Sequence, residues 1–537
     1  MNGAESLIRT LLACGVDTCF TNPGTSEMHF VAALDRIDGM RCVLGLFEGV
    51  VTGAADGFGR MTGRPASTLL HLGPGLGNGL ANLHNAHKAH TPIVNIVGEH
   101  ATYHRPYNPP LAANIEGIAR TYSQWVKTSA SSKSVAEDAA AAVAAALAPP
   151  GNISTLILPA DVAWNEATSA AGPWFVDART KVDDARVRDA ADALRKDQAA
   201  LLLDGPMLRS MPLEICGRIA EATGAQVWCA FGVSRIERGA GRVAADRVPY
   251  FVDIAVQRLA HLRNIVLVNA EAPVAFFAYP GKPSVLTAPE CEITTLAGVA
   301  EDGVDAVQRL AELVGADKVE AKRESLTRPG LPIGPMSLAG LAGVISALLP
   351  ENAIVVDEAI TSGRNLYAAT KNAPPHDWLT NVGGSIGNAM PVAVGAAVAC
   401  PDRKVVCIQG DGSAMYTVQA LWTMARESLN IVTLICANRT YEILKGEFKN
   451  VGAIAAGRKA ADMLDIGRPD LDWVALAKGH GVPASRATNL EELGQQLRRG
   501  MSEQGPYLIE VVLSRNPVFA GSRKSLMPEI SHSNFLE

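Results

Sequence analysis

Short apolar runs rich in Val, Ile and Leu alternate with helical segments along the whole chain, and this alternation limits the possible folds more than any other feature. Strands separated by crossover helices predict parallel sheets, which need helices on both faces. A chain of 537 residues is also too long for one hydrophobic core. We therefore predict an α/β protein with three doubly wound parallel-sheet domains.

The apolar runs fall into three blocks. We expect domains at residues 1–170, 189–325 and 331–537, with a loose linker over 164–188 that mixes Gly, Pro, Ala and charged residues. The expected strands lie within 41–47, 66–72, 92–99, 153–162, 199–205, 226–231, 264–274, 284–290, 353–359, 404–413, 430–440 and 506–514. Ligands of such sheets bind beyond the carboxyl ends of the strands, so we expect the chemistry there.

Charge and composition argue against several classes of function. The formal net charge is −6 and Lys and Arg are scattered, which leaves no basic surface for a nucleic acid. No run reaches the roughly 18 apolar residues of a membrane span. The first residues suggest an amphipathic helix rather than a secretory signal, and the nine cysteines form no CxxC pair. We expect a cytoplasmic protein without nucleic-acid or membrane partners.

The strongest local signal is the segment Gly410-Asp411-Gly412-Ser413, which follows an apolar strand. A helical segment and a second apolar strand come next, and that strand ends near Asn438. One right-handed crossover would make the two strand ends neighbours. A carboxylate beside a carboxamide suits Mg²⁺, and the glycines and the following helix would let the backbone approach a diphosphate. The alternative is a Gly-Asp-Gly turn with a structural Asn.

Two further segments fit a cofactor site. Glu48 follows the apolar run 41–47 and precedes a helix of small residues, where a carboxylate is costly to bury without a proton or a partner. Its alternative role is the N-terminal acid of an ordinary helix, where the helix dipole favours it. The Gly-rich segment 381–391 precedes another small-residue helix, and its alternative role is tight helix packing.

Together these segments resemble the thiamine-diphosphate enzyme family, whose motif is GDG, a helix-length spacer and an Asn-containing strand end. The resemblance implies that Asp411, Asn438 and the main-chain oxygen of Thr440 hold the metal. By the same resemblance, Gly384 would offer its carbonyl to the aminopyrimidine and Ile386 would force the cofactor to bend. The other residues implied at the cofactor are Glu48, Gly410, Gly412, Ser413, Tyr441 and Glu442.

The resemblance also implies a catalytic role and an assembly. Glu48 would hydrogen-bond the pyrimidine nitrogen and so assist removal of the thiazolium proton. In the family this Glu and the diphosphate site belong to different subunits, which implies at least a homodimer and, as our expectation, a homotetramer. The chain departs from the motif at Ala437 and Arg439, where family members often have Asn and Gly.

Within the family the chain is most similar to benzoylformate decarboxylases and, more broadly, to acetolactate synthases, through segments 21–27, 70–78 and 410–423. Thr25 takes the position of a Ser that contacts the substrate carboxylate. His71 matches an active-site His, which could polarise a carbonyl or move a proton. A structural histidine at a strand end is the alternative.

Two positions, Ala278 and Glu447, predict a substrate pocket unlike that of benzoylformate decarboxylases. Ala278 aligns with a second active-site His, whereas Leu444 and Glu447 fall in the segment that lines the aromatic pocket. An acidic group there would repel a substrate carboxylate unless it is neutral or faces away, and it could instead receive a polar or cationic substrate. Acetolactate synthases bind FAD in the middle domain, and we assign no FAD residues in this chain.

The resemblance implies non-oxidative decarboxylation of a 2-oxo acid, carboligation to a 2-hydroxyketone, or both, with thiamine diphosphate and Mg²⁺. The acceptor would be an aldehyde or a second 2-oxo acid. One alternative is an acetolactate synthase-like carboligase that uses pyruvate, and another is a catalytically silent, cofactor-binding regulatory paralogue. A dinucleotide-dependent dehydrogenase fits less well, because the Gly-rich segment 73–79 contains Pro and lacks the acidic partner at the next strand.

Overall fold

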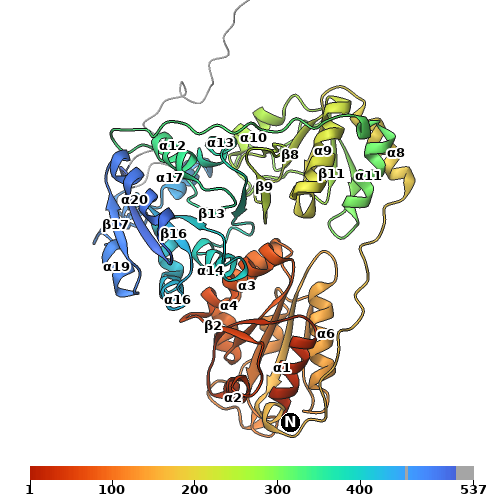
Figure 1. The fold of residues 1–537 in the computed structure, drawn as a ribbon, viewed down its shortest axis with the longest axis vertical. Coiled ribbons are helices and arrows are strands. Elements are labelled where there is room, and N and C mark those ends of the chain that lie inside the picture. The colour runs from red at the N-terminus through yellow and green to blue at the C-terminus, as the bar shows by residue number, and fades with distance from the viewer. Residues whose placement is uncertain (454–456, 516–537) are drawn as a thin grey trace, which may run out of the picture.

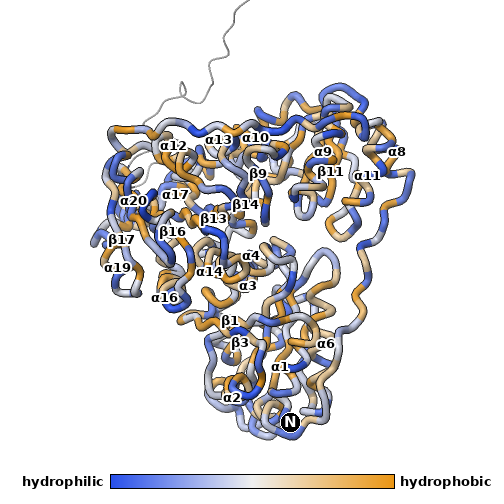
Figure 2. The backbone as a smooth tube through the Cα atoms, viewed as in Figure 1, coloured by the Kyte–Doolittle hydropathy of each residue, from blue (hydrophilic) through white to orange (hydrophobic). Residues whose placement is uncertain are grey.

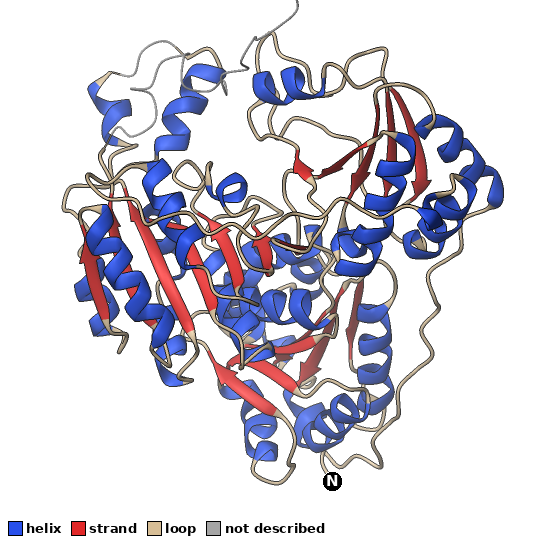
Figure 3. Cartoon of the chain, turned by 45° about the horizontal axis from the view of Figure 1, so that its top comes forward, coloured by secondary structure: helices blue, strands red, loops and turns tan. Residues whose placement is uncertain are grey.

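The computed structural model describes residues 1–453 and 457–515. Three sheets, each flanked by helices, make up this part of the chain (Figures 1 and 3). The predicted α/β class with three parallel sheets is confirmed, because every strand pair but one is parallel in the described ranges. Within the same ranges, no helix is long and apolar enough to cross a membrane.

The first sheet occupies the lower part of Figure 1. Its block contains α1 (Gly3–Ala13), β1 (Thr18–Asn22), α2 (Met28–Leu34), β2 (Arg41–Leu44), α3 (Glu48–Thr62), β3 (Ala66–Leu70), α4 (Leu72–Lys88), β4 (Ile93–Glu99), α5 (Ile115–Ala119), β5 (Trp125–Thr128), α6 (Val135–Leu147), β6 (Ile153–Pro159) and α7 (Ala160–Trp164). The six strands are parallel in the order β2-β1-β3-β4-β6-β5. Strands β3, β4 and β6 are buried along their whole length, which explains their continuous apolar and β-branched sequences.

A long connection leads from the first block to the middle block along the outside of the molecule (Figure 1). The linker that we predicted over 164–188 ends earlier in the structure, because α8 (Asp184–Leu194) begins within it. The side chain of Asp183 accepts the main-chain N–H of Arg186 and so caps this helix, a local signal that the mixed composition of the stretch hides.

The middle block adds β7 (Ala199–Leu203), α9 (Ser210–Thr223), β8 (Gln226–Cys229), β10 (Asp246–Arg247), α10 (Val252–Leu259), β11 (Asn264–Val268), β12 (Glu292–Ala297) and α11 (Gly303–Leu313). Its five parallel strands follow the order β10-β8-β7-β11-β12. The prediction of a strand at 284–290 is wrong. This stretch instead folds back on the loop after β11, and the Leu286 N–H donates a hydrogen bond of 3.1 Å to the Pro273 carbonyl oxygen. The strand beside β11 at this edge of the sheet is β12, whose half-exposed sequence lacks the apolar run of a buried strand.

The third block contains α12 (Leu338–Leu348), β13 (Ile354–Glu358), α13 (Leu366–Ala369), β14 (His376–Thr380), α14 (Ala389–Ala399), β15 (Val405–Gly410), α15 (Asp411–Ala414), α16 (Ala420–Arg426), β16 (Ile431–Ala437), α17 (Glu442–Asn450), α18 (Arg458–Asp462), α19 (Trp473–Gly479), β17 (Ala484–Ala487), α20 (Leu490–Ser502) and β18 (Tyr507–Val512). Its sheet also takes in β9 (Ile236–Arg238) from the middle block, in the order β17-β18-β16-β15-β13-β14-β9. Strand β9 pairs antiparallel with β14 and so covers what would be an open sheet edge.

Helices α3 and α14 join the first and third blocks. Small residues allow their close approach, because a Cβ added at Gly57 would clash with the carbonyl oxygen of Val392, and one at Gly395 with that of Ala54. The mostly hydrophobic α14 lies in the interior beside α3 (Figure 2). Because α3 begins at Glu48 and α14 follows the Gly-rich segment, this contact holds two of the predicted cofactor segments in fixed relation.

Candidate active site

Glu48 is the first residue of α3, at the carboxyl edge of the first sheet. Its side chain is buried, and both carboxylate oxygens accept hydrogen bonds from carboxamides, Oε1 from Asn22 Nδ2 at 3.1 Å and Oε2 from Asn78 Nδ2 at 2.9 Å. Asn22 ends β1 and Asn78 lies in α4, so three elements converge on one acid. The carboxylate therefore has the partners that its burial requires, and both partners are neutral.

Thr25 and His71 follow the neighbouring strands β1 and β3 at the same edge of the sheet. Thr25 is exposed, whereas 24% of the His71 side chain is exposed. His71 Nδ1 lies 2.8 Å from Oε2 of Glu27, and the same oxygen accepts the main-chain N–H of Gly24 at 2.7 Å. Since Glu27 occupies Nδ1, the other ring nitrogen of His71 remains available to a ligand.

Glu27 is a site residue that the sequence reasoning missed. It is buried, and burial raises the pKa of its carboxyl group, while the Gly24 amide and His71 oppose that shift. Its other oxygen, Oε1, makes no hydrogen bond to a residue within the described ranges. Nothing in the segment 21–27 distinguishes this acid from an exposed one, because its partner His71 is distant in sequence.

Asp411 and Asn438 lie at the ends of neighbouring parallel strands, as the spacing predicts. Strands β15 and β16 pair in parallel register, and the two side chains that follow them are buried. The Asp411 carboxylate accepts main-chain N–H bonds from Gly412 at 2.9 Å and Arg439 at 2.6 Å. Burial raises the pKa of Asp411 to about 6, and the amide bonds oppose this only in part.

These residues fit a hard divalent cation. A buried carboxylate whose partners are amides has uncompensated charge, and a carboxamide oxygen lies at the next strand end. Clusters of three or more His, Cys, Asp or Glu side chains that could hold a metal do not occur within residues 1–453 and 457–515. A metal here would therefore depend on Asp411, Asn438 and a main-chain oxygen, with phosphate and water as the remaining ligands.

The turn after β16 holds that main-chain oxygen in place. Asn438 Oδ1 accepts the N–H of Thr440 at 3.1 Å, and the carbonyl oxygen of Thr440 accepts the N–H of Glu442 at 2.9 Å. Glu442, the first residue of α17, is buried. Arg439 has a φ of 58°, in the left-handed region that favours glycine.

The Gly-Asp-Gly turn packs against the same loop. A Cβ added at Gly412 would lie 2.5 Å from the ring of Tyr441, so the ring can take this position only because residue 412 is a glycine. Ser413 Oγ donates to the carbonyl of Gly410 at 3.1 Å and so closes the turn. The predicted residues Gly410, Gly412, Ser413 and Tyr441 therefore form one compact unit around Asp411.

Gly384 is an exposed residue whose conformation requires glycine. Its φ is 78°, and its N–H donates to Asn381 Oδ1 at 2.8 Å. A Cβ at this position would also clash with the ring of Phe276, which comes from the middle block. Ile386 is half-buried two residues further on. The structure thus places a middle-block ring directly against the predicted cofactor segment.

A second buried acid, Glu358, supports this segment, and the sequence reasoning also missed it. Its carboxylate accepts five hydrogen bonds of 2.8–3.0 Å from Asn381 Nδ2, Gln409 Nε2 and the main-chain N–H groups of Gly387, Asn388 and Ala389. Burial raises the pKa of Glu358 from 4.5 to about 7, although these donors oppose the shift. The sequence signal that could have revealed Glu358 is its place as an acid at the end of a buried apolar run.

The predicted substrate-pocket residues lie on two elements that approach each other. Ala278 is exposed in the loop after β11, and the exposed Leu444 and half-buried Glu447 lie on α17. Tyr250 Oη donates to Glu447 Oε1 at 3.3 Å, which links the middle block to α17. The Glu447 side chain is therefore directed toward the middle block.

Helix α4 contacts the Gly384 segment within the same chain. Asn85 Nδ2 donates to the carbonyl of Ser385 at 2.8 Å, and His84 Nε2 lies 3.0 Å from the carbonyl of Gly383. The Glu48 carboxylate, in contrast, bonds only to the first block's carboxamides among the residues that the structure describes. The first and third blocks thus meet through helices.

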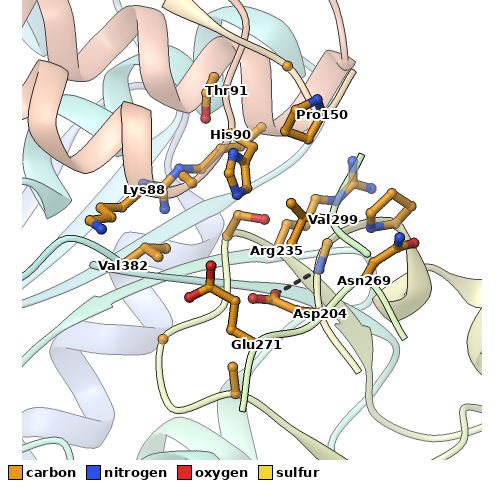
Figure 4. Close-up of a pocket in the computed structure, with 18 of the residues that line it drawn as sticks. Lys88, His90, Thr91, Pro150, Asp204, Arg235, Asn269, Glu271, Val299 and Val382 are labelled. Atoms are coloured by element: carbon orange, nitrogen blue, oxygen red, sulfur yellow. Dashed lines mark hydrogen bonds between the residues drawn. The ribbon is translucent and has the colours of Figure 1, made fainter. Parts of the chain in front are cut away.

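A cavity of about 910 Å³ lies between the first and middle blocks (Figure 4). Asp204 and Asn269, which follow β7 and β11, line it together with Arg235, Glu271 and, from the first block, His90. Its wall therefore mixes acidic and basic groups. None of the single residues predicted at the cofactor lines it, but Val382 of the Gly-rich segment 381–391 does, so the cavity borders that segment.

Comparison with known proteins assigns the class. Residues 1–125 match the thiamine pyrophosphate enzyme N-terminal TPP binding domain, and residues 362–511 match the C-terminal TPP binding domain. The Mycobacterium tuberculosis protein IlvX is 50% identical over 518 residues. Its name describes an acetolactate synthase large subunit and marks that assignment as unproven. That match covers 96% of this chain and 99% of that protein. The chain belongs to the thiamine-diphosphate-dependent enzyme family.

Two further comparisons concern the type of enzyme. Benzoylformate decarboxylase of Pseudomonas aeruginosa is 29% identical over 520 residues, covering 93% of this chain and 96% of that protein. The solved thiamine diphosphate-dependent 4-hydroxybenzoylformate decarboxylase of Rhodococcus jostii RHA1 has a TM-score of 0.82 at 24% identity, covering 96% and 100% of the chains, which shows a shared fold. Within its family the chain is an enzyme of the acetolactate synthase and decarboxylase type.

Proposed function

We propose that this enzyme catalyses the non-oxidative decarboxylation of a 2-oxo acid, carboligation to a 2-hydroxyketone, or both, with thiamine diphosphate and Mg²⁺. The observation that carries the proposal is the buried Glu48 carboxylate, which is held by two neutral carboxamides and so can share a proton with a ring nitrogen. Purely structural burial would be cheaper with an apolar residue at this position.

Each predicted residue has a separate task. Asp411, Asn438 and the Thr440 carbonyl would hold Mg²⁺, and Gly384 would offer its carbonyl to the aminopyrimidine. Thiamine diphosphate, when bound, supplies the electron sink for the pair left by carbon dioxide. Glu48 holds a proton at the pyrimidine nitrogen, and its orientation is fixed by Asn22 and Asn78.

The His71–Glu27 pair handles the substrate end in this proposal. Glu27 fixes the ring of His71 through Nδ1, which leaves Nε2 to exchange a proton with an oxygen of the substrate. Thr25, exposed on the adjacent loop, would bind the substrate carboxylate with its hydroxyl. The substrate would thus be held by the first block and react at a cofactor held by the third.

The assembly is part of the proposal. We infer at least a homodimer, with a homotetramer as the expected form, because family enzymes combine the Glu of one subunit with the diphosphate site of another. A cytoplasmic location and the absence of nucleic-acid partners stay predictions from the sequence. We also propose that the middle block works without FAD, which predicts no flavin absorbance in the visible spectrum of the purified enzyme.

A panel of 2-oxo acids tests the reaction. Carbon dioxide release is expected only with both thiamine diphosphate and Mg²⁺, and the products with and without an added aldehyde separate ligation from simple decarboxylation. If no member of a panel of aliphatic, aromatic and charged 2-oxo acids loses carbon dioxide, the proposed reaction is wrong.

Acetolactate synthesis is the second candidate, because the 50% identical relative carries that name. Incubation with pyruvate separates the two, since the second candidate predicts acetolactate and simple decarboxylation predicts acetaldehyde. A catalytically silent paralogue is disfavoured by Glu48, because a protein that only binds the cofactor has no chemical need for this acid.

A further inference from the structure

A carboxylate among aromatic rings borders the candidate active site on the middle-block side. We call Tyr250, Phe276, Tyr279 and Glu447 the Glu447 cluster. Tyr250 Oη donates to Glu447 Oε1 at 3.3 Å, and the ring centroids of Tyr250 and Phe276 are 5.6 Å apart. Burial, then hydrogen bonding to the Glu447 carboxylate and then the charge of that carboxylate raise the pKa of Tyr279 to about 12. Burial and, after it, the charge of the Glu447 carboxylate raise the pKa of Tyr250, so both phenols keep their protons at neutral pH.

The Glu447 cluster is joined to both parts of the predicted cofactor site. Phe276 packs against Gly384, the residue expected to contact the aminopyrimidine. Helix α17, which carries Glu447, begins two residues after Thr440, an expected metal ligand. A continuous path of contacts therefore runs from the cofactor segment through Phe276 and Tyr250 to the Glu447 carboxylate.

One oxygen of Glu447 lacks a donor. Oε2 is buried and makes no hydrogen bond to any residue that the structure describes. Lys282 Nζ lies 5.6 Å from the ring centroid of Tyr279, but it bonds to Asp253 Oδ2 at 2.8 Å and to Asn450 Oδ1 at 3.3 Å. A buried carboxylate oxygen without a donor is costly, so the site has the chemistry to accept a hydrogen bond from a ligand.

We propose that the Glu447 cluster recognises the far end of the substrate, and that the substrate is a 2-oxo acid whose side chain ends in a cationic nitrogen group such as a guanidinium. This inference rests on the proposed function and names its substrate class. The N–H group of the cation donates to Oε2, and the charge that it carries neutralises the unpaired carboxylate.

The surrounding rings fit the same substrate class. Phe276 is 42% exposed, so its face is available to the alkyl part of a side chain and to the cation itself. Tyr250 holds the carboxylate through Oε1, which leaves Oε2 for the ligand. A substrate with an aromatic side chain and no hydrogen-bond donor would place an apolar group against an unpaired charge. Such a substrate should therefore bind more weakly.

Two substrates and two variants test this inference. The 2-oxo acid of arginine and phenylglyoxylate are compared with wild-type enzyme, Glu447→Gln and the control Glu221→Gln, which removes one charge from an exposed position on α9. Wild-type enzyme should have the higher kcat/KM for the guanidino acid. Glu447→Gln keeps an acceptor for Tyr250 and should lower that kcat/KM about ten- to a hundred-fold, mainly through KM, without lowering that for phenylglyoxylate.

A binding measurement separates this inference from the reaction itself. Argininic acid carries the same guanidinium but has a 2-hydroxyl in place of the carbonyl, so calorimetry reports its affinity for the holoenzyme without turnover. The affinity should fall at least about tenfold in Glu447→Gln and stay unchanged in Glu221→Gln. If argininic acid binds in this way while no 2-oxo acid is decarboxylated, the recognition stands and the proposed reaction fails. Equal affinity in the wild type and Glu447→Gln, or a wild-type preference for phenylglyoxylate, overturns the inference.

Discussion

Glu48 and Glu358 are both buried glutamates near the carboxyl end of a parallel strand, but their surroundings differ. Five donors surround the Glu358 carboxylate, and three of them are main-chain N–H groups where α14 begins. Glu48 has two donors, both side-chain carboxamides. A carboxylate has about four lone-pair sites, so Glu358 is saturated whereas Glu48 can still bond a ligand. We infer that the number of donors distinguishes an acid that positions the backbone from one that can react.

The largest effect is expected at Glu48. In Glu48→Gln the carboxamides keep an oxygen partner, but the proton needed at the pyrimidine nitrogen is no longer shared, so turnover should fall about 10²- to 10⁴-fold. Thiamine diphosphate affinity, measured by calorimetry, should change by less than about tenfold, because Glu48 is separate from the diphosphate residues. Retained turnover in this variant would show that the two-donor acid is not the reacting one.

Asp411→Asn should act on the cofactor instead. Removing a residue that hydrogen-bonds a metal ligand already weakens metal affinity about ten- to a hundred-fold. Removing the charge of the ligand itself should therefore lower the affinity at least about a hundred-fold. The measurement is a calorimetric titration with thiamine diphosphate at fixed Mg²⁺, alongside Glu221→Gln. An affinity equal to that of the control would contradict the metal assignment.

Glu358→Ala tests the saturated acid. It leaves five donors without their acceptor, and each unsatisfied buried donor costs about 1–3 kcal/mol, so the free energy of unfolding should fall by about 3 kcal/mol or more. Urea unfolding of the holoenzyme measures this change, and Glu358→Gln, which keeps one acceptor oxygen, should lose less. Equal losses of unfolding free energy in the two variants would show that the five hydrogen bonds to Glu358 do not stabilise the segment before α14.

The same acid predicts a pH dependence. Its folded-state pKa is raised to about 7 from 4.5, so its contribution to stability is complete below about pH 4.5 and is lost as the pH rises through about 7. Glu358→Gln cannot titrate, and the stability difference between wild type and this variant should therefore shift by about 3 kcal/mol across that range. A pH-independent difference would argue against a raised pKa.

The smallest effect is expected at Glu27. Glu27→Gln keeps an acceptor for the Gly24 amide but removes the charge beside His71, so kcat should fall about tenfold or less and the pH profile of kcat should shift. A profile identical to that of the wild type would leave Glu27 with a purely structural role.

The sequence was sufficient for the parts of the site that follow local rules. Asp411 and Asn438 each end an apolar run, and the crossover rule brings them together. Glu27 and Glu358 were missed because their roles depend on partners from other elements. The strand at β12 was missed because an edge strand carries exposed polar residues, and β9 because its pairing with β14 crosses between blocks.

The substrate side depends even more on tertiary contacts. The sequence predicts that Glu447 lies in a segment lining the substrate pocket, but the direction of its side chain comes from the hydrogen bond to Tyr250 in another block. Likewise, the contact of Phe276 with Gly384 joins residues that no spacing rule connects.

The most direct test of the account is a calorimetric titration of the purified enzyme with thiamine diphosphate, with and without Mg²⁺. We predict saturable binding that requires Mg²⁺, is retained in Glu48→Gln and is lost in Asp411→Asn. Absence of binding to the wild type, or binding that is indifferent to both Mg²⁺ and Asp411, would contradict the central claim that the third block holds this cofactor through a divalent cation.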